Sequence, residues 1–156
     1  MRLYLVQHGE AVPDDVDPTR PLSGGGRSDV ERVARFLARG GIRAVEVWHS
    51  GKRRVEQTAA ILGAALAPDR PPAARAGLNP NDPTDGAARE IAVRDQDVMV
   101  VGHLPFMGRL ASRLVAGRDD AGVVAFRPGT VLCLERTDQE GWTVVWMATP
   151  EWFRGT

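Results

Sequence analysis

The chain has 156 residues, a length that suits one domain with a sizeable hydrophobic core. Its 20 Lys and Arg balance its 20 Asp and Glu, so the overall charge favours neither nucleic acid nor a membrane surface as a partner. No apolar run approaches the ~20 residues that span a bilayer, and the N-terminus shows no signal peptide. We therefore expect a cytoplasmic protein that forms one domain over residues 1–156 and has no membrane or nucleic-acid partner.

The first half of the chain predicts two strands and two helices. An unbroken apolar run over Leu3–Val6 indicates a strand buried on both faces. Ser23 is the predicted N-cap of a helix that carries one apolar stripe and ends at Gly40-Gly41. A second strand over 44–48 and a second helix over 53–66 follow.

The second half continues the alternation. Prolines make the segment 67–84 irregular, and it is too short to build a lid domain. The next predicted elements are a short helix over 85–94, a buried strand over 97–101, a helix from Pro105 to Gly117, and closing strands over 123–126, 130–136 and 142–147, with a turn at 139–141. This order predicts an α/β fold, a three-layer αβα sandwich whose sheet is mostly parallel with an antiparallel edge.

All three histidines of the chain follow apolar strands. His8, His49 and His103 each stand at the carboxyl end of a predicted strand, where open α/β sheets bind ligands. A zinc site made by the three is conceivable, but no Cys or Asp/Glu ligand spacing supports it, and we expect neither metal nor cofactor. The single cysteine, Cys133, lies in an apolar run and is expected to be a buried structural thiol.

Four motifs occur in one order at characteristic spacings. They are Gln7-His8-Gly9-Glu10-Ala11, Arg20-Pro21-Leu22-Ser23 with Gly26, Ser50 with Arg54-Val55-Glu56-Gln57-Thr58-Ala59, and Gly102-His103-Leu104-Pro105. Together they resemble the histidine phosphatase superfamily, specifically its small SixA-type phosphohistidine phosphatase branch, from residue 1 to about residue 150. The resemblance implies a phosphoglycerate mutase-like fold and a metal-independent phosphatase, which is a hydrolase.

The resemblance also implies a role for each matched residue. His8 would attack phosphorus and carry the phosphoryl group, which a neutral imidazole can do near pH 7. Arg54 would bind phosphate with its planar guanidinium. His103 would donate to the phosphoryl oxygens as charge builds in the transition state.

For three further residues the sequence leaves two roles open. Arg20 is expected at the pocket mouth as a phosphate or substrate contact, with an ordinary loop arginine as the alternative. Ser50 either bonds phosphate or caps the second helix. His49 either lines the pocket or packs at its strand end.

The chain departs from the family pattern at two places. Gln7 stands where the family normally has arginine, so one neutral amide replaces a charged two-pronged phosphate donor, and Arg20 or Arg53 could supply part of the missing charge. We expect activity to survive in weakened form. Gly77 stands where larger members carry a carboxylic acid that acts as the proton donor. Asp82 and Asp85 are nearby candidates for this role, but each is more simply explained as a solvated loop carboxylate.

A missing acid is tolerable when the leaving group departs easily, as imidazole does from phosphohistidine. The sequence therefore favours a phosphohistidine-containing protein, such as a phosphotransfer domain, as the substrate. One alternative is a small-molecule phosphomonoesterase on the same scaffold. The other is a phosphate-binding module that has lost catalysis because of Gln7.

Overall fold

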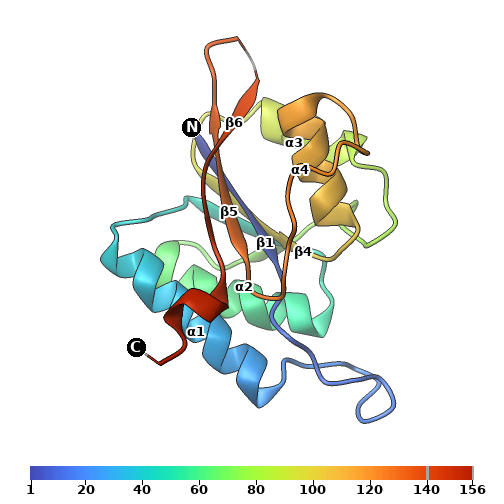
Figure 1. Cartoon of the computed structure of the whole chain (residues 1–156), viewed down its shortest axis with the longest axis vertical. Helices are drawn as coiled ribbons and strands as arrows, with labels where there is room; N and C mark the ends of the chain where they lie inside the picture. The colour runs from blue at the N-terminus through green and yellow to red at the C-terminus, as the bar shows by residue number, and fades with distance from the viewer. Residues whose placement is uncertain (140, 156) are drawn as a thin grey trace.

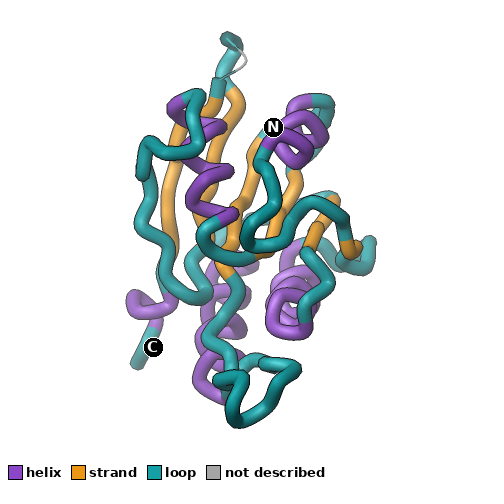
Figure 2. Tube along the Cα trace, turned by 90° about the vertical axis from the view of Figure 1, so that its right-hand side faces the viewer, coloured by secondary structure: helices purple, strands orange, loops and turns teal. Residues whose placement is uncertain are grey.

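The structure is a computed structural model that describes residues 1–139 and 141–155. A six-stranded sheet runs through its centre in the order β3-β2-β4-β1-β5-β6, with helices packed on both faces (Figure 1; Figure 2). The strands are β1 (Arg2–Gln7), β2 (Glu46–His49), β3 (Ala73–Ala74), β4 (Val98–Gly102), β5 (Val131–Arg136) and β6 (Trp142–Ala148). The helices are α1 (Gly24–Arg39), α2 (Arg53–Leu66), α3 (Asp85–Ala92), α4 (Phe106–Ala116) and a final 3₁₀ turn, η1 (Pro150–Phe153).

The predicted fold class is confirmed. The strands β3, β2, β4 and β1 run parallel to one another, whereas β5 is antiparallel to both β1 and β6. The segment 67–84 contributes only the two-residue β3 and loops, so this described segment builds no lid.

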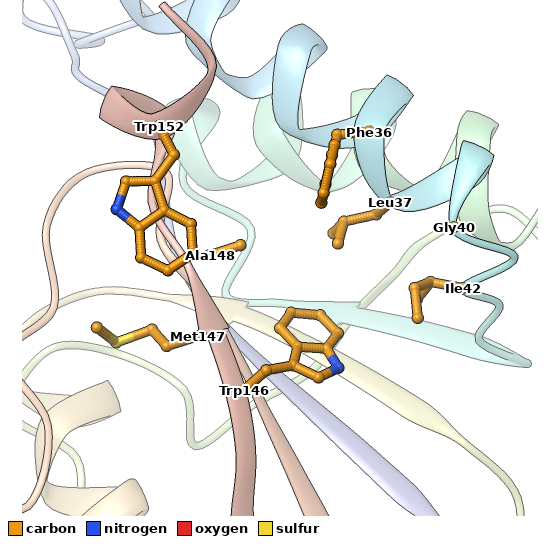
Figure 3. Close-up of a pocket in the computed structure, with 8 residues that line it drawn as sticks. All are labelled: Phe36, Leu37, Gly40, Ile42, Trp146, Met147, Ala148 and Trp152. Carbon is orange, nitrogen blue, oxygen red and sulfur yellow. The ribbon is translucent and has the colours of Figure 1, made fainter.

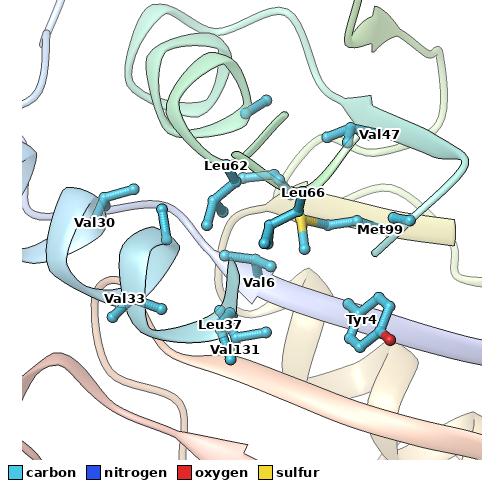
Figure 4. Packing of buried hydrophobic residues seen from close by; sticks show 14 of the residues in the cluster. Tyr4, Val6, Val30, Val33, Leu37, Val47, Leu62, Leu66, Met99 and Val131 are labelled. Atoms are coloured by element: carbon cyan, nitrogen blue, oxygen red, sulfur yellow. The ribbon is translucent and has the colours of Figure 1, made fainter. Parts of the chain in front are cut away.

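The alternation of side chains along β1 separates two hydrophobic cores. Tyr4 and Val6 lie on the side of α1 and α2, in the core cluster that also contains Leu62 and Leu66 (Figure 4). Leu3 and Leu5 face the opposite side and pack with residues of α3 and α4. Each fully buried Leu contributes roughly 1.5–3 kcal/mol, so burial on both faces holds β1 firmly at the centre of the sheet. The residue that follows β1 is thereby fixed in place.

The helix ends follow the predicted signals. The Ser23 hydroxyl accepts a hydrogen bond from the Gly26 N–H (3.0 Å) and caps α1. Gly41, just after α1, adopts a φ of +75°, and Gly117 ends α4 with a φ of +78°. α2 spans the predicted residues 53–66.

One predicted strand is wrong. Residues 123–126 form a loop and pair with none of the six strands of the described sheet. The apolar character of this segment has another cause, since Val124 and Phe126 pack as loop residues against the α3/α4 core. Of the predicted turn at 139–141, residue 140 lies outside the described residues.

The two edges of the sheet are short or irregular. β3 has only two residues. In β6, Cys133 pairs with Trp146 but Leu134 pairs with Val144, so Val145 forms a bulge without a cross-strand partner. No helix in the described ranges is long and apolar enough to cross a bilayer.

Candidate active site

The ends of two neighbouring parallel strands bring the first two site residues together. Gln7 of β1 pairs with Gly102 of β4, and the His8 N–H donates to the Gly102 carbonyl (3.0 Å). His8 and His103 therefore leave adjacent strand ends at the same edge of the sheet. Their ring centroids lie 5.4 Å apart in an edge-to-face arrangement. The structure thus brings together the two imidazoles for which the sequence predicted one site.

Arg54 joins this pair from the first turn of α2. Its Nη2 donates to Nδ1 of His103 at 3.3 Å, while its buried Nε has no hydrogen-bond partner among the described residues. The guanidinium makes no ion pair with any described carboxylate. A partly buried cation with unused N–H groups is suited to bind an oxyanion.

Ser50 fixes the other nitrogen of His103. The Ser50 hydroxyl lies 2.7 Å from His103 Nε2. Because Nδ1 accepts from Arg54, a neutral ring carries its proton on Nε2 and donates it to the Ser50 oxygen. Ser50 therefore lies at the predicted site, and its hydroxyl hydrogen remains available for a further acceptor.

The chain fixes the tautomer of His8 through a backbone contact. Nδ1 of His8 lies 2.6 Å from the Gly9 carbonyl oxygen, which can only accept, so Nδ1 carries the proton. Nε2 then keeps its lone pair, as a nucleophile requires. Gly9 is needed here because a Cβ would lie 2.8 Å from Val30 and 3.1 Å from Leu22.

The surroundings keep both imidazoles neutral at pH 7. Burial lowers the pKa of His8, and the positive charges of Arg54 and Arg20 lower it further, against a raising effect of the Gly9 carbonyl. Burial and the Arg54 charge lower the pKa of His103 to about 4. Burial and Arg20 also lower the pKa of Arg54. The cluster is electropositive and unneutralised, a field that favours a dianion such as a phosphoryl group.

Gln7 is almost enclosed, with 8% of its surface exposed. Its amide oxygen is buried and has no hydrogen-bond partner in the described part of the chain. A buried carbonyl of this kind costs free energy, so Gln7 is not optimised for fold stability. The neutral amide next to His8 leaves this position without the family's charge.

Arg20, expected at the pocket mouth, has a strained backbone conformation. Its φ of +45° is unusual for a residue with a Cβ, and its Nε donates to the Val12 carbonyl (3.2 Å). Burial is the main cause of the lowered pKa of His8 and of Arg54, and the Arg20 charge makes a smaller contribution in the same direction. Arg53 is exposed, and its guanidinium donates to the Thr19 hydroxyl (2.9 Å) and to no site residue in the described structure.

His49 does not join the cluster. Its buried ring accepts a hydrogen bond at Nδ1 from the Gly51 N–H (3.1 Å), which fixes the turn that leads into α2. Of the two open roles, strand-end packing is the one that the contacts support. No three His, Cys, Asp or Glu among the described residues lie close enough to hold a metal ion.

The candidate acids are engaged elsewhere. Asp82 accepts from the Asn79 N–H (2.9 Å) within its own turn, and Asp85 forms an ion pair with Arg113 of α4. Gly77 has a φ of +82°, a conformation that favours glycine over an acid with a Cβ. Glycine therefore stands at the position of the family's acid because the backbone there adopts a positive φ.

Two polar residues of α2 position the site without having been assigned a role from sequence. The Thr58 hydroxyl accepts from the Gly9 N–H (3.1 Å) and donates to the Arg54 carbonyl (2.8 Å). Gln57 accepts from the Leu22 N–H (2.7 Å) and anchors the segment after Arg20. The sequence signal that could have pointed to Thr58 is a threonine on the apolar face of the helix, one turn after Arg54.

A separate apolar pocket of about 220 Å³ lies between the end of α1 and β6 (Figure 3). It contains no ionisable side chain, and therefore offers none of the groups that the site above combines. Its lining residues are Phe36, Leu37, Gly40, Ile42, Trp146, Met147, Ala148 and Trp152.

Comparisons with known proteins agree with this fold. No protein-family model matches the chain. An uncharacterized protein from Picosynechococcus sp. is 29% identical over 167 aligned positions, covering 97% of this chain and 98% of that protein. The solved structure of the protein histidine phosphatase SixA with tungstate superposes at a TM-score of 0.81 and 23% identity, over 96% of this chain and 97% of that one.

A proposed SixA phosphohistidine phosphatase from Nakamurella multipartitia superposes at a TM-score of 0.74 and 26% identity, over 96% of this chain and 95% of that one. The strand order and the antiparallel edge described above are thus shared along almost the whole chain. The chain has the phosphoglycerate mutase-like fold of the histidine phosphatase superfamily.

Proposed function

We propose that the protein is a phosphatase that removes the phosphoryl group from phosphohistidine in a protein, through a phosphohistidine intermediate on His8. The observation that carries this proposal is the convergence of two neutral imidazoles and an unpaired guanidinium. The His8 and His103 rings lie 5.4 Å apart, and Arg54 donates to His103 at 3.3 Å. Tungstate, which the SixA structure contains, is a tetrahedral oxyanion of the kind this arrangement suits.

In the proposed complex the phosphoryl oxygens lie between Arg54, Ser50 and His103. Arg54 supplies a fixed charge and N–H donors, and Ser50 supplies its hydroxyl hydrogen. The single N–H of neutral His103 donates to the Ser50 oxygen, so His103 acts on the phosphoryl oxygens through the Ser50 hydroxyl. Gln7 adds a neutral amide and Arg20 a charge at the mouth.

The first chemical step transfers the phosphoryl group to His8. Its Nε2 attacks phosphorus while the P–N bond of the substrate breaks, and the leaving imidazole takes a proton from solvent at its other ring nitrogen. The His8 ring becomes cationic because Nδ1 keeps its proton, and the Gly9 carbonyl at 2.6 Å stabilises that charge. In the second step water attacks phosphorus, the bond to Nε2 breaks, and inorganic phosphate leaves.

Two features favour phosphohistidine over an alkyl phosphate. Asp82 accepts a hydrogen bond from Asn79, and Asp85 forms an ion pair with Arg113 of α4, so neither offers a proton to an alkoxide leaving group. The described segment 67–84 builds no lid, which leaves room for a protein side chain to enter. Imidazole needs no strong acid to leave. The same reaction needs no metal, because Arg54 supplies the charge and His8 the nucleophile, and we expect EDTA to leave the rate unchanged.

The proposal is tested by trapping the phosphoryl group on the protein. After mixing with a ³²P-labelled phosphohistidine peptide and quenching under alkaline conditions, we expect label on the wild-type protein and none on His8→Ala. A substrate panel of phosphohistidine peptide, aryl phosphate and sugar phosphates then ranks the substrates. Preference for a sugar phosphate would replace the proposal by a small-molecule phosphomonoesterase.

A binding module without catalysis is the remaining rival, and the uncharged Gln7 is the observation behind it. It predicts that vanadate binds while no substrate turns over and His8 is never labelled. Turnover that depends on His8 refutes that rival. Vanadate binding by a protein without turnover refutes the phosphatase.

A further inference from the structure

We propose that Thr58 is a positioning residue that holds the nucleophile His8 against the phosphate-binding end of α2. This inference rests on the proposed function. Thr58 has 0% of its surface exposed, and its hydroxyl makes two hydrogen bonds. It accepts from the Gly9 N–H at 3.1 Å and donates to the Arg54 carbonyl at 2.8 Å.

The two bonds join segments that are distant in sequence. Gly9 follows β1 and binds the His8 ring through its carbonyl, whereas Arg54 opens α2. One hydroxyl therefore fixes the His8–Gly9 peptide, which precedes the Gly9 carbonyl that selects the His8 tautomer, relative to the turn that carries the phosphate-binding guanidinium. No other single side chain in the described structure bonds to the backbone of both segments.

Gly9 depends on this contact. Its N–H has Thr58 as its hydrogen-bond partner, and its carbonyl is occupied by Nδ1 of His8. On the side of α1, Gly9 is confined by Val30 and by the Gly26 carbonyl, which a Cβ would meet at 2.8 and 3.1 Å. If the hydroxyl is removed, the buried Gly9 N–H loses its partner, and the His8–Gly9 peptide can rotate toward another acceptor.

Rotation of that peptide acts on catalysis through His8. Rotation of the His8–Gly9 peptide changes the backbone angles at Gly9 and thereby shifts the next peptide, which carries the Gly9 carbonyl, away from Nδ1. The ring would then lose both its orientation and its preference for the Nδ1–H tautomer. Arg54 would stay in place, because the rest of α2 packs in the core through Val55, Ala59 and Leu62. We therefore expect the rate of phosphoryl transfer to fall while the affinity for the phosphate group is kept.

The decisive comparison is Thr58→Ser against Thr58→Val. Serine keeps the hydroxyl and loses the methyl group, whereas valine keeps the shape and loses the hydroxyl. Since misplacing a reacting group by ~1 Å costs ~10²-fold, we expect Thr58→Val to lower kcat by about 100-fold. KM should change by less than about 3-fold, and Thr58→Ser should retain most of kcat.

A control separates positioning from packing. Thr84 is another buried threonine, with 1% of its surface exposed, but its hydroxyl donates to Asp119 and not to a site residue. Thr84→Val should leave kcat unchanged whatever it does to thermal stability. If Thr58→Val does not fold, Thr58→Cys replaces it, because its thiol is only a weak donor. The kcat of Thr58→Cys should be lower than that of wild type and of Thr58→Ser, but above zero.

A second readout does not depend on turnover. In ¹⁵N spectra of imidazole-labelled protein above the pKa of His8, wild type and Thr58→Ser should show His8 protonated at Nδ1, and Thr58→Val should show a mixture of tautomers. A protein without any phosphatase activity but with this pattern refutes the proposed function and keeps the role of Thr58. The positioning role is refuted if the wild type is active, Thr58→Val is equally active and Thr58→Ser is impaired. That result would show that Thr58 acts through the packing of its methyl group.

Discussion

Gln7→Arg restores the guanidinium that the family pattern has before the catalytic histidine. Gln7 lies at the end of β1 with 8% of its surface exposed, beside a cluster that already holds Arg54 and receives the charge of Arg20. Since a preorganised donor at a transition-state charge is worth ~10²–10³ in rate, we expect the substitution to raise turnover of an aryl phosphate by about 10²-fold.

The same substitution should lower stability in the absence of an anion. The Arg54 guanidinium makes no ion pair with a described carboxylate, so a second buried cation would have no compensating partner. An uncompensated buried charge costs roughly 3–5 kcal/mol. In a chain of this size each 1 kcal/mol changes Tm by about 2–4 °C, which predicts a fall of roughly 6–20 °C. Vanadate at 100 times its Kd should return about 2.7 kcal/mol.

The assay is steady-state hydrolysis of an aryl phosphate together with thermal unfolding with and without vanadate. Gln96→Arg adds the same charge at an exposed turn before β4 and should change neither quantity. Gln7→Met keeps the size and removes the amide, and should lower turnover below that of wild type. Unchanged or lower turnover in Gln7→Arg, with normal vanadate binding, would show that the pocket is tuned around the amide and would refute the reasoning.

Three other predictions concern neighbouring features. Folding lowers the pKa of His103 from 6.5 to about 4, so unfolding takes up a proton below pH 6.5. The free energy of unfolding should therefore drop by about 3 kcal/mol from pH 7 to pH 4. In urea titrations, the drop for His103→Gln should be smaller by that amount. Ser50→Ala removes the acceptor for the His103 N–H and should lower kcat/KM about 5-fold; a faster variant would show instead that Ser50 competes with the substrate for that proton. Gly26→Ala would place a Cβ against the Glu10 backbone and should lower the free energy of unfolding, measured with urea, by about 1–3 kcal/mol. Gly24→Ala, whose Cβ meets nothing within 4 Å, should leave it unchanged. Equal effects of the two substitutions would contradict the close approach of Gly26 to Glu10.

The elements that local signals specify were predictable from the sequence. The bounds of α2 and the cap of α1 at Ser23 match the structure, because periodicity and capping chemistry act within one or two turns. Residues 123–126 were wrong because burial was taken as pairing, although Val124 and Phe126 bury their side chains without a ladder partner. The short β3 and η1 were missed, since two to four residues carry too little pattern.

The site was predictable where motif and strand end coincide. His8 and His103 converge as expected because β1 and β4 are neighbours, a fact of strand order that the sequence does not reveal. His49 ends the next strand, β2, yet its ring is turned to Gly51. The role of Thr58 could not be predicted, because it depends on which distant amide meets a buried hydroxyl.

The bulge at Val145 and the two-residue β3 determine how another chain can approach the molecule. A partner that added a strand would need a long, regular edge of free N–H and C=O groups. One border of the described sheet is too short for this, and the other is interrupted between Trp146 and Val144. Recognition of the phosphorylated protein that we propose as the substrate should therefore depend on side chains around the site. The same irregular borders should protect the folded chain from edge-to-edge aggregation.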